Sequence, residues 1–260
     1  MKIAVIGAGA MGGAVARGLV DAGHNPALIT VANPSEGKLA PLAALGINTH
    51  TDNLKAVSEA DIVIVAVKPW IVPQVAEELR DVLDYDRQEV AVIVAGVSAD
   101  DLAGMLRGNA GQLPALSIVM PNTAMTLRKS MTFVVEVNGK ATRAVELFEH
   151  LGRVMVIEER LLPAATALAS CGIAYAMRYV RAAVEGGVEL GFRASDAQDI
   201  VVATISGAAA LLSLPGAHPE AEIDKVTTPG GITIRGLNAM EAAGFTPAVI
   251  AGLKAGRSAK

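Results

Sequence analysis

The residues with the clearest chemical meaning are six near the start of the chain, Gly7-Ala8-Gly9-Ala10-Met11-Gly12. This GxGxxG pattern directly follows a short apolar run, residues 2–6, and opens an amphipathic stretch. In such a strand–turn–helix unit the first glycine makes the tight turn, the second lets the backbone approach a pyrophosphate, and the third lets helix and strand pack closely. Free N–H groups at the helix N-terminus then face the phosphates. The context predicts a dinucleotide site, and the alternative is a glycine-rich turn without a ligand.

The end of the second apolar run, residues 27–32, indicates which dinucleotide binds. Proteins that prefer NAD usually carry Asp or Glu there, which accepts a hydrogen bond from the ribose 2′-hydroxyl. This chain has Asn33-Pro34-Ser35 instead. Asn33, Ser35 and Lys38 are able to donate hydrogen bonds to a 2′-phosphate, so NADPH is the expected cofactor. NADH stays an alternative, because no arginine is present to clamp that phosphate.

A second segment able to do chemistry lies near the other end of the chain, Val226-Thr227-Thr228-Pro229-Gly230-Gly231-Ile232-Thr233-Ile234. A helix is predicted over 232–243, so residues 226–231 form the loop that leads into its N-terminus. Backbone N–H groups at such a place hold a carboxylate without adding a negative group nearby. The alternative is an ordinary helix start, with Thr227 or Thr228 as the cap and Pro229 at the first helical position.

The first part of the chain, residues 1–159, alternates short apolar runs with amphipathic stretches. Strand–helix alternation of this kind predicts an α/β fold, a Rossmann-like, doubly wound and mainly parallel sheet. The expected strands are 2–6, 27–32, 62–67, 90–94, 116–120, 132–137 and 154–157, and the expected helices are 11–22, 36–45, 73–82, 99–106 and 141–151.

The second part, residues 160–260, contains no predicted strand. We expect helices over 160–191, 195–212, 232–243 and 247–254, with a loop rich in Pro and Gly over 214–220. This all-α part is dominated by small residues and is too short to bury enough apolar surface alone. It is therefore expected to pack against a second copy of itself as a homodimer.

Membrane insertion is the alternative for the apolar helices of the second part. Residues 161–177 and 200–219 carry no charged side chain and approach the length of a membrane span. Each contains hydroxyl residues and a proline, and Pro215-Gly216 ends the second run. Burial in a subunit interface explains both stretches better, so no membrane partner is expected.

Charge and cysteine content narrow the remaining classes. The net charge of −4 indicates no nucleic-acid partner, because polyanion binders usually carry a basic face. The single cysteine, Cys171, excludes an intrachain disulfide framework and fits a reducing, cytoplasmic location. The N-terminus has no long apolar run followed by a cleavage site, so no signal peptide is expected. The four histidines lack metal-ligand spacing, and no metal is predicted.

Taken together, these residues are similar to the pyrroline-5-carboxylate reductase family over the full length of the chain. The most specific marker is the segment 226–234, which is close to the family pattern V-[TS]-[TS]-P-G-G-x-T. His218-Pro219 and Asp224, just before it, also fit. The other markers are Gly7–Gly12, Ala66-Val67-Lys68-Pro69, Ala95-Gly96-Val97 and Met120-Pro121-Asn122-Thr123.

The resemblance implies an NAD(P)H-dependent reductase of a cyclic imine carboxylate, pyrroline-5-carboxylate to proline, as in proline biosynthesis. Hydride would pass to the C=N carbon, with the Thr233 hydroxyl near the imine nitrogen as the catalytic donor. The implied substrate residues are Asp224, Val226, Thr228, Gly230 and Gly231. The implied cofactor residues are Gly7, Gly9, Ala10, Met11, Gly12, Asn33, Ser35, Ala66, Val67, Lys68, Pro69, Ala95 and Asn122.

Two points stay open within this resemblance. Asn122 either orients the nicotinamide amide or caps a turn. The C-terminal helices are implied to interleave with those of a partner subunit, and assemblies above the dimer occur in the family.

The chain departs from the family pattern at the start of its long helix. The family usually has S-G-S-G-P-A-[YF], whereas this chain has Ala169-Ser170-Cys171-Gly172-Ile173-Ala174-Tyr175. The change leaves two alternatives, a reductase of a different cyclic imine and a nucleotide-binding dimer that serves as a sensor or scaffold without catalysis. A β-hydroxyacid dehydrogenase is disfavoured, because that class needs a lysine on the long helix and residues 160–177 contain only Arg160 as a basic side chain.

Overall fold

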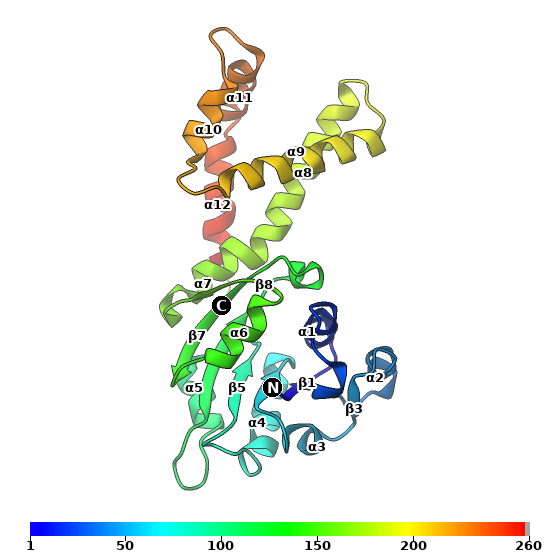
Figure 1. Cartoon of the computed structure of the whole chain (residues 1–260). Coiled ribbons are helices and arrows are strands. Elements are labelled where there is room, and N and C mark those ends of the chain that lie inside the picture. Colours follow the sequence, from blue (N-terminus) through cyan, green and yellow to red (C-terminus); the bar gives the residue numbers. More distant parts are fainter. Residues whose placement is uncertain (258–260) are drawn as a thin grey trace. The chain divides into compact units, whose positions relative to one another are not determined.

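The computed structural model describes residues 1–257 and divides the chain into two compact units, Met1–Ser170 and a helical unit that begins at Cys171 (Figure 1). The expected α/β class with a following all-α part is confirmed. The boundary lies later than the expected one after residue 159. The physical reason is packing, because Ala165 is buried together with Met120 and Phe133 of the sheet.

An eight-stranded sheet forms the middle of the first unit, in the order β3-β2-β1-β4-β5-β6-β7-β8. Strands β1 to β6 are all parallel to one another. Strand β7 runs antiparallel to β6, and β8 is parallel to β7. The chain leaves β1 towards β2 on one side and returns to β4 on the other, so a topological switch point lies at β1. The strands are β1 (Ile3–Ile6), β2 (Ile29–Ala32), β3 (Asn48–His50), β4 (Ile62–Val65), β5 (Glu89–Val92), β6 (Ala115–Met120), β7 (Ser130–Asn138) and β8 (Gly152–Val156).

Helices cover both faces of this sheet, which is why its central strands are apolar throughout. In β4, Ile62 and Ile64 belong to one core cluster, and Val63 and Val65 belong to the other. The first cluster includes residues of α1 (Ala10–Asp21), α2 (Glu36–Ala43) and α6 (Thr142–Glu149). The second includes residues of α3 (Asn53–Val57), α4 (Val72–Arg80) and α5 (Ala99–Met105).

Three short elements of this unit differ from the sequence prediction. The strand β3 and the helix α3 were not expected, because Asn48-Thr49-His50 is polar and α3 has only five residues. The expected strand 27–32 begins instead with a 3₁₀ turn, Pro26–Leu28, whose Ala27 N–H donates to Asn25 Oδ1 at 3.0 Å. Such elements are too short for a periodic pattern to develop.

The second unit is entirely helical over the residues described. It follows α7 (Leu162–Ala165) and a π-helical stretch, Thr166–Ser170, and comprises α8 (Cys171–Glu189), α9 (Ala194–Leu212), α10 (Pro219–Val226), α11 (Ile232–Ala242) and α12 (Phe245–Arg257). The helix α10 was not predicted; Pro219 occupies its first turn, where a missing N–H costs nothing. Helices α8 and α9 pack on each other as a hairpin (Figure 1).

These helices leave most of their apolar surface uncovered. Ala197 is the one buried residue of α8 to α12 as far as the structure describes them. Met177 of α8 is 66% exposed and Val202 of α9 is 50% exposed, and both line a groove between these two helices. Exposed apolar surface on this scale marks an interaction site.

One helical stretch among the described residues, Glu159–Glu189, is long and apolar enough to cross a membrane by length and composition alone, which is weak support for a span. Its charged residues argue against that role. Arg181 Nε pairs with Glu185 Oε1 at 2.8 Å within the stretch. Charges in hydrocarbon are costly, whereas the same pair is inexpensive at a water-accessible interface.

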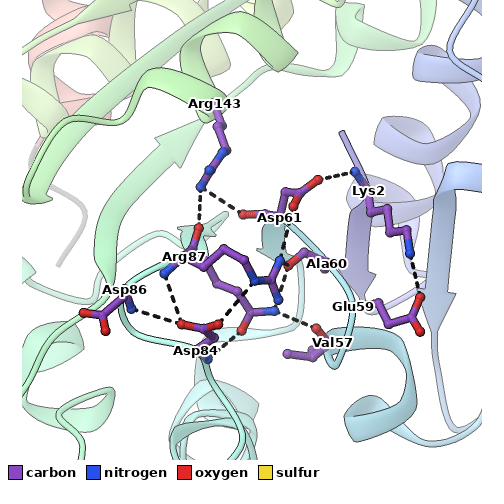
Figure 2. A network of polar contacts seen from close by, with 10 residues as sticks. Lys2, Val57, Glu59, Ala60, Asp61, Asp84, Asp86, Arg87 and Arg143 are labelled. Atoms are coloured by element: carbon purple, nitrogen blue, oxygen red, sulfur yellow. Dashed lines mark hydrogen bonds and ion pairs between the residues drawn. The ribbon is translucent and has the colours of Figure 1, made fainter.

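Polar contacts tie the strands together at the amino edge of the sheet, opposite the carboxyl ends. Asp61 Oδ2 accepts a hydrogen bond from the Lys2 N–H at 2.7 Å, and Arg87 Nη1 donates to Asp61 Oδ1 at 3.2 Å (Figure 2). Arg143 Nη1 donates to the Arg87 carbonyl at 2.6 Å. These bonds join the segments before β1, β4 and β5 to α6.

Glu89 caps α6 from the neighbouring strand β5. Its side chain is buried, and its two carboxylate oxygens accept from the N–H groups of Arg143 (2.9 Å) and Ala144 (2.8 Å). The helix has no cap of its own, because Ala141 stands at the N-cap position. Burial raises the pKa of Glu89 above its ordinary value, in spite of these bonds.

We expect opposite pH dependences of stability from Glu89 and Asp61. The raised pKa of Glu89 means that its contribution to the free energy of unfolding is full below about pH 4.3 and falls as the pH rises through the raised value. The hydrogen bond from Lys2 lowers the pKa of Asp61, so its contribution is present above about pH 3.9 and is lost as the pH falls through the lowered value.

Urea unfolding between about pH 3 and pH 7 measures both effects. Wild type should lose stability relative to Glu89→Gln as the pH rises, and should lose stability relative to Asp61→Asn as the pH falls. Differences that do not change with pH in either pair would contradict the assignment for that residue.

Candidate active site

The carboxyl ends of five parallel strands bring the predicted cofactor residues to one edge of the sheet. Gly7 follows β1, Asn33 follows β2, Ala66 follows β4, Ala95 lies three residues beyond β5, and Asn122 lies two beyond β6. Ligands of doubly wound sheets bind at this edge, next to the switch point. We call this set of strand ends the cofactor edge.

The three glycines of the motif have three different surroundings. Gly7 has φ +105°, and a Cβ there would lie 2.6 Å from the carbonyl oxygen of Ala66. A Cβ on Gly12 would collide with the carbonyl oxygen of Gly7. A Cβ on Gly9 would meet no atom within 4 Å. The first and third glycines therefore permit close packing, and the second opens onto free space, as the roles predicted for them require.

The helix α1 offers unpaired donors to that space. Its N-cap is Gly9, which has no side chain, and its first helical bond runs from the Gly13 N–H to the Gly9 carbonyl at 2.9 Å. The N–H groups of Ala10, Met11 and Gly12 therefore have no acceptor among the described residues. Three free donors at the positive end of a helix fit a pyrophosphate.

The residues after β2 divide into two groups. Ser35 is the N-cap of α2 but makes no side-chain cap bond, and Ser35 and Lys38 are both exposed. Asn33, in contrast, is 8% exposed, and its Oδ1 accepts from the Ala8 N–H at 3.1 Å. Ser35 and Lys38 are thus free to meet a 2′-phosphate, whereas the amide of Asn33 points into the protein. No signal in the sequence gives the direction of this amide.

The segment after β4 lies beside the glycine turn. The Ala66 N–H donates to the carbonyl of Ile6, the last residue of β1, at 2.8 Å. Lys68 precedes a 3₁₀ turn, Pro69–Ile71, and is exposed, with no ion-pair partner among residues 1–257. Val67 is half-buried next to Gly7, 3.1 Å from a Cβ built there. The Lys68 ammonium is therefore available to an anionic ligand.

Asn122 is buried, and both its side chain and its backbone N–H are hydrogen-bonded. Its Oδ1 accepts from the Ala124 N–H at 3.1 Å, and its Nδ2 donates to the Ala169 carbonyl in the π-helical stretch at 3.3 Å. Its own N–H donates to Ser130 Oγ at 3.1 Å. Of the two roles left open by the sequence, these contacts support the turn cap. They also tie the end of β6 to the segment that precedes α8.

We expect Asn122→Ala to lower the free energy of unfolding by about 2 kcal/mol, because it removes the partly buried side-chain hydrogen bonds to the Ala124 N–H and the Ala169 carbonyl, each worth about 1 kcal/mol. Asn109→Ala, which removes an exposed side-chain bond to Asp81, is the control and should change it by less than about 0.5 kcal/mol. Urea unfolding of the cofactor-free chain gives both values. An Asn122 variant as stable as wild type but deficient in NADPH binding would instead favour the nicotinamide role.

The second group of predicted residues lies in the helical unit, in the turn before α11. The Thr228 carbonyl accepts from the Gly231 N–H at 2.9 Å, with Pro229 second and Gly230 third in the turn. Gly230 has φ +70°, so this is the geometry of a type II turn. The ordinary helix start is not what forms here, because the N-cap is Gly231, without any side-chain bond, and Pro229 lies outside the helix.

The side chains around this turn face solvent in the chain as described. Val226 is 63% exposed, and Asp224 and Thr233 are also exposed. The N–H groups of the first turn of α11 and the Thr233 hydroxyl have no acceptor among the described residues. The turn and the helix start thus present several donors, which fit a carboxylate and a second polar atom of one small molecule.

Among the same residues, no group of three or more His, Cys, Asp or Glu side chains converges. The structure therefore assembles two sites of hydrogen-bond donors, the cofactor edge in the first unit and the turn before α11 in the second. Neither contains a side chain able to transfer electrons. The free donors of the cofactor edge fit the pyrophosphate of a dinucleotide, which would supply redox chemistry when bound.

Strand order, glycine turn and switch point define an α/β protein of the dinucleotide-binding class, with a separate helical unit. Residues 159–259 match the family model for pyrroline-5-carboxylate reductase dimerisation, and residues 2–105 match that for NADP oxidoreductase, coenzyme F420-dependent. Pyrroline-5-carboxylate reductase 2 of Dictyostelium discoideum is 34% identical over 270 residues, covering 97% of this chain and 89% of the relative. The chain belongs to the pyrroline-5-carboxylate reductase family.

Two further comparisons agree. Pyrroline-5-carboxylate reductase 1 of Dictyostelium discoideum is 39% identical over 275 residues, which cover 96% of this chain; the chain spans only 48% of that relative's length. The solved structure of a pyrroline-5-carboxylate reductase from Coxiella burnetii superimposes with a TM-score of 0.90 at 28% identity, covering 98% of this chain and 96% of the other. Both units therefore have counterparts in the family.

Proposed function

We propose that this protein reduces pyrroline-5-carboxylate to proline with NADPH. The observation that carries the proposal is that this member of the family has two sets of free N–H donors. One set lies at the glycine turn and the N-terminus of α1, and the other lies at the start of α11. The family match and the full-length relatives named pyrroline-5-carboxylate reductase support the substrate. The description of the N-terminal family model as an NADP oxidoreductase supports the cofactor, together with the absence of a carboxylate at the end of β2.

The chain's own residues then have separate tasks. The N–H groups of Ala10, Met11 and Gly12 hold the pyrophosphate, and Ser35 and Lys38 receive the 2′-phosphate. The bound dinucleotide supplies the hydride for the C=N carbon. N–H groups at the turn before α11 fix the substrate carboxylate.

Thr233 acts at the imine nitrogen. As the nitrogen gains electron density, the Thr233 hydroxyl transfers its proton to the nitrogen, and the hydroxyl regains a proton from water. The net change is two electrons and two protons: a hydride on carbon and a proton on nitrogen. Positioning of the two reactants provides most of the acceleration.

We further propose that the protein works as a homodimer through the helices from α8 onward. Their uncovered apolar residues and the dimerisation model that matches residues 159–259 support this arrangement. A cytoplasmic location is proposed on the single cysteine, Cys171, and on the substrate class. Light scattering on purified protein tests the assembly, and a monomer at micromolar concentration would contradict it.

A second candidate is reduction of a different cyclic imine. The observation that favours it is the altered segment 169–175, where the family's proline is Ile173. This segment includes the end of the π-helical stretch and the start of α8. A six-membered imine acid is therefore the alternative substrate to compare.

The test is oxidation of NADPH at 340 nm by the purified protein with pyrroline-5-carboxylate, in parallel with NADH and with a six-membered imine acid. Faster turnover of pyrroline-5-carboxylate with NADPH is the expected result. Preference for the six-membered ring would replace the substrate assignment. Tight NADPH binding without turnover of either imine would favour the sensor or scaffold.

A further inference from the structure

Asn33 occupies the position at which dinucleotide-binding proteins usually carry the residue that binds the ribose 2′-hydroxyl. Its side chain, however, is hydrogen-bonded to the protein's own backbone. It is the first residue after β2 and is 8% exposed. Its Oδ1 accepts from the Ala8 N–H at 3.1 Å, and its Nδ2 donates to the Ser35 carbonyl at 3.2 Å. Its backbone N–H donates to the His50 carbonyl at 3.1 Å.

These bonds join two loops that meet different parts of the cofactor. Ala8 lies in the middle of the glycine turn and is itself 8% exposed, so its N–H has no access to an alternative partner in water. Ser35 carries the N-cap of α2 and the exposed hydroxyl assigned to the 2′-phosphate. The Asn33 side-chain amide therefore holds the backbone of the glycine turn and the backbone at Ser35 in fixed positions relative to each other.

Only an amide of this length makes both bonds. An aspartate supplies an acceptor for Ala8 but sets a second oxygen against the Ser35 carbonyl, and a leucine of similar size supplies neither atom. Losing the acceptor leaves the Ala8 N–H buried without a partner, which costs free energy that only a displaced loop recovers. The displaced loop no longer aims the donors of α1 at the pyrophosphate.

We propose that Asn33 is a positioning residue that couples the glycine turn to the Ser35 loop, and that it sets both dinucleotide affinity and the preference for NADPH without touching the 2′-phosphate. The proposal rests on the proposed function only in that the protein binds NADPH and NADH. It differs from the expectation that Asn33 donates to the phosphate directly.

Titration calorimetry of the full chain with NADPH and NADH separates these roles. Asn33→Leu is expected to weaken NADH binding about tenfold through the glycine turn, and NADPH binding about thirtyfold, because both loops contribute. Ser35→Ala is expected to weaken NADPH alone, by about tenfold. In the Asn33→Leu background, Ser35→Ala should weaken NADPH binding only about threefold, because part of the Ser35 contribution is already lost through the shared loop.

Asn25→Leu is the matched control. Asn25 makes the same kind of side-chain bond, in which its Oδ1 accepts from the Ala27 N–H at 3.0 Å, but at the opposite end of β2. It should leave both affinities unchanged. A loss confined to NADPH in Asn33→Leu would make Asn33 a direct ligand and overturn the proposal. Equal losses of NADPH and NADH affinity in Asn33→Leu would overturn the coupling to Ser35. Unchanged affinities in that variant would overturn both the role in dinucleotide affinity and the role in NADPH preference.

A second measurement needs no variant. In hydrogen exchange of the cofactor-free wild type, the Ala8 amide is expected to be protected to the same degree as the amides of β1. Rapid exchange of Ala8 would contradict the bond to Asn33. A wild-type chain that binds neither dinucleotide would sink the proposed function itself, whereas normal binding with an unaffected Asn33→Leu variant would sink only this inference.

Discussion

Replacing Thr233 by valine is expected to lower kcat for imine reduction about a hundredfold or more, while the NADPH dissociation constant stays unchanged. Valine keeps the size and branching of threonine and removes only the hydroxyl. Loss of a positioned proton donor typically costs two or more orders of magnitude in rate, about 10²–10⁴. Since the residue is exposed and its hydroxyl has no partner among the described residues, stability should change by less than about 0.5 kcal/mol.

Steady-state rates at saturating NADPH give the kcat comparison. Thr233→Ser restores a hydroxyl at the same position and should recover most of the rate. Thr246→Val is the matched control, because Thr246 lies in α12 and uses its hydroxyl for Glu241 Oε2 at 2.8 Å. A Thr233→Val enzyme with wild-type kcat would remove Thr233 from the mechanism, and the proton would then have to come from water or another donor.

Two alanine substitutions in the glycine turn should both weaken NADPH binding, but only one of them should also destabilise the chain. Gly12→Ala places a methyl group against the carbonyl oxygen of Gly7, so α1 cannot keep its distance from β1. We expect it to destabilise the chain by about 3 kcal/mol and to abolish NADPH binding. Gly9→Ala meets no atom within 4 Å and has an ordinary φ of −73°, so stability should change by less than about 1 kcal/mol.

The Gly9 variant nevertheless should bind NADPH at least about tenfold more weakly, because its methyl group occupies the space through which the pyrophosphate approaches the α1 donors. Urea unfolding without cofactor and calorimetric titration with NADPH separate the two variants. A Gly9→Ala variant with wild-type NADPH affinity would show that the pyrophosphate does not bind at this turn. Wild-type stability in Gly12→Ala would contradict the close contact between α1 and β1.

Features that depend on neighbouring residues in the chain were predictable from the sequence. A buried parallel strand needs an uninterrupted apolar run, and Ile62–Val65 has one; hence the doubly wound sheet and most of its helices follow from periodicity. The glycine turn is equally local, because φ at Gly7 and the packing of Gly12 follow from one strand–turn–helix unit. The same holds for the Thr228–Gly231 turn, where Pro229 and Gly230 select the geometry.

Tertiary structure decided what side chains do across long separations. The bonds of Asn33 to Ala8, of Asn122 to Ala169 and of Glu89 to Ala144 span 25, 47 and 55 residues. A sequence shows that an amide or a carboxylate is present, but the direction of its hydrogen bonds depends on which backbone groups the fold leaves unpaired beside it. That is why the sequence placed Asn33 among the phosphate ligands, and why only the folded chain shows it bound to Ala8 and Ser35.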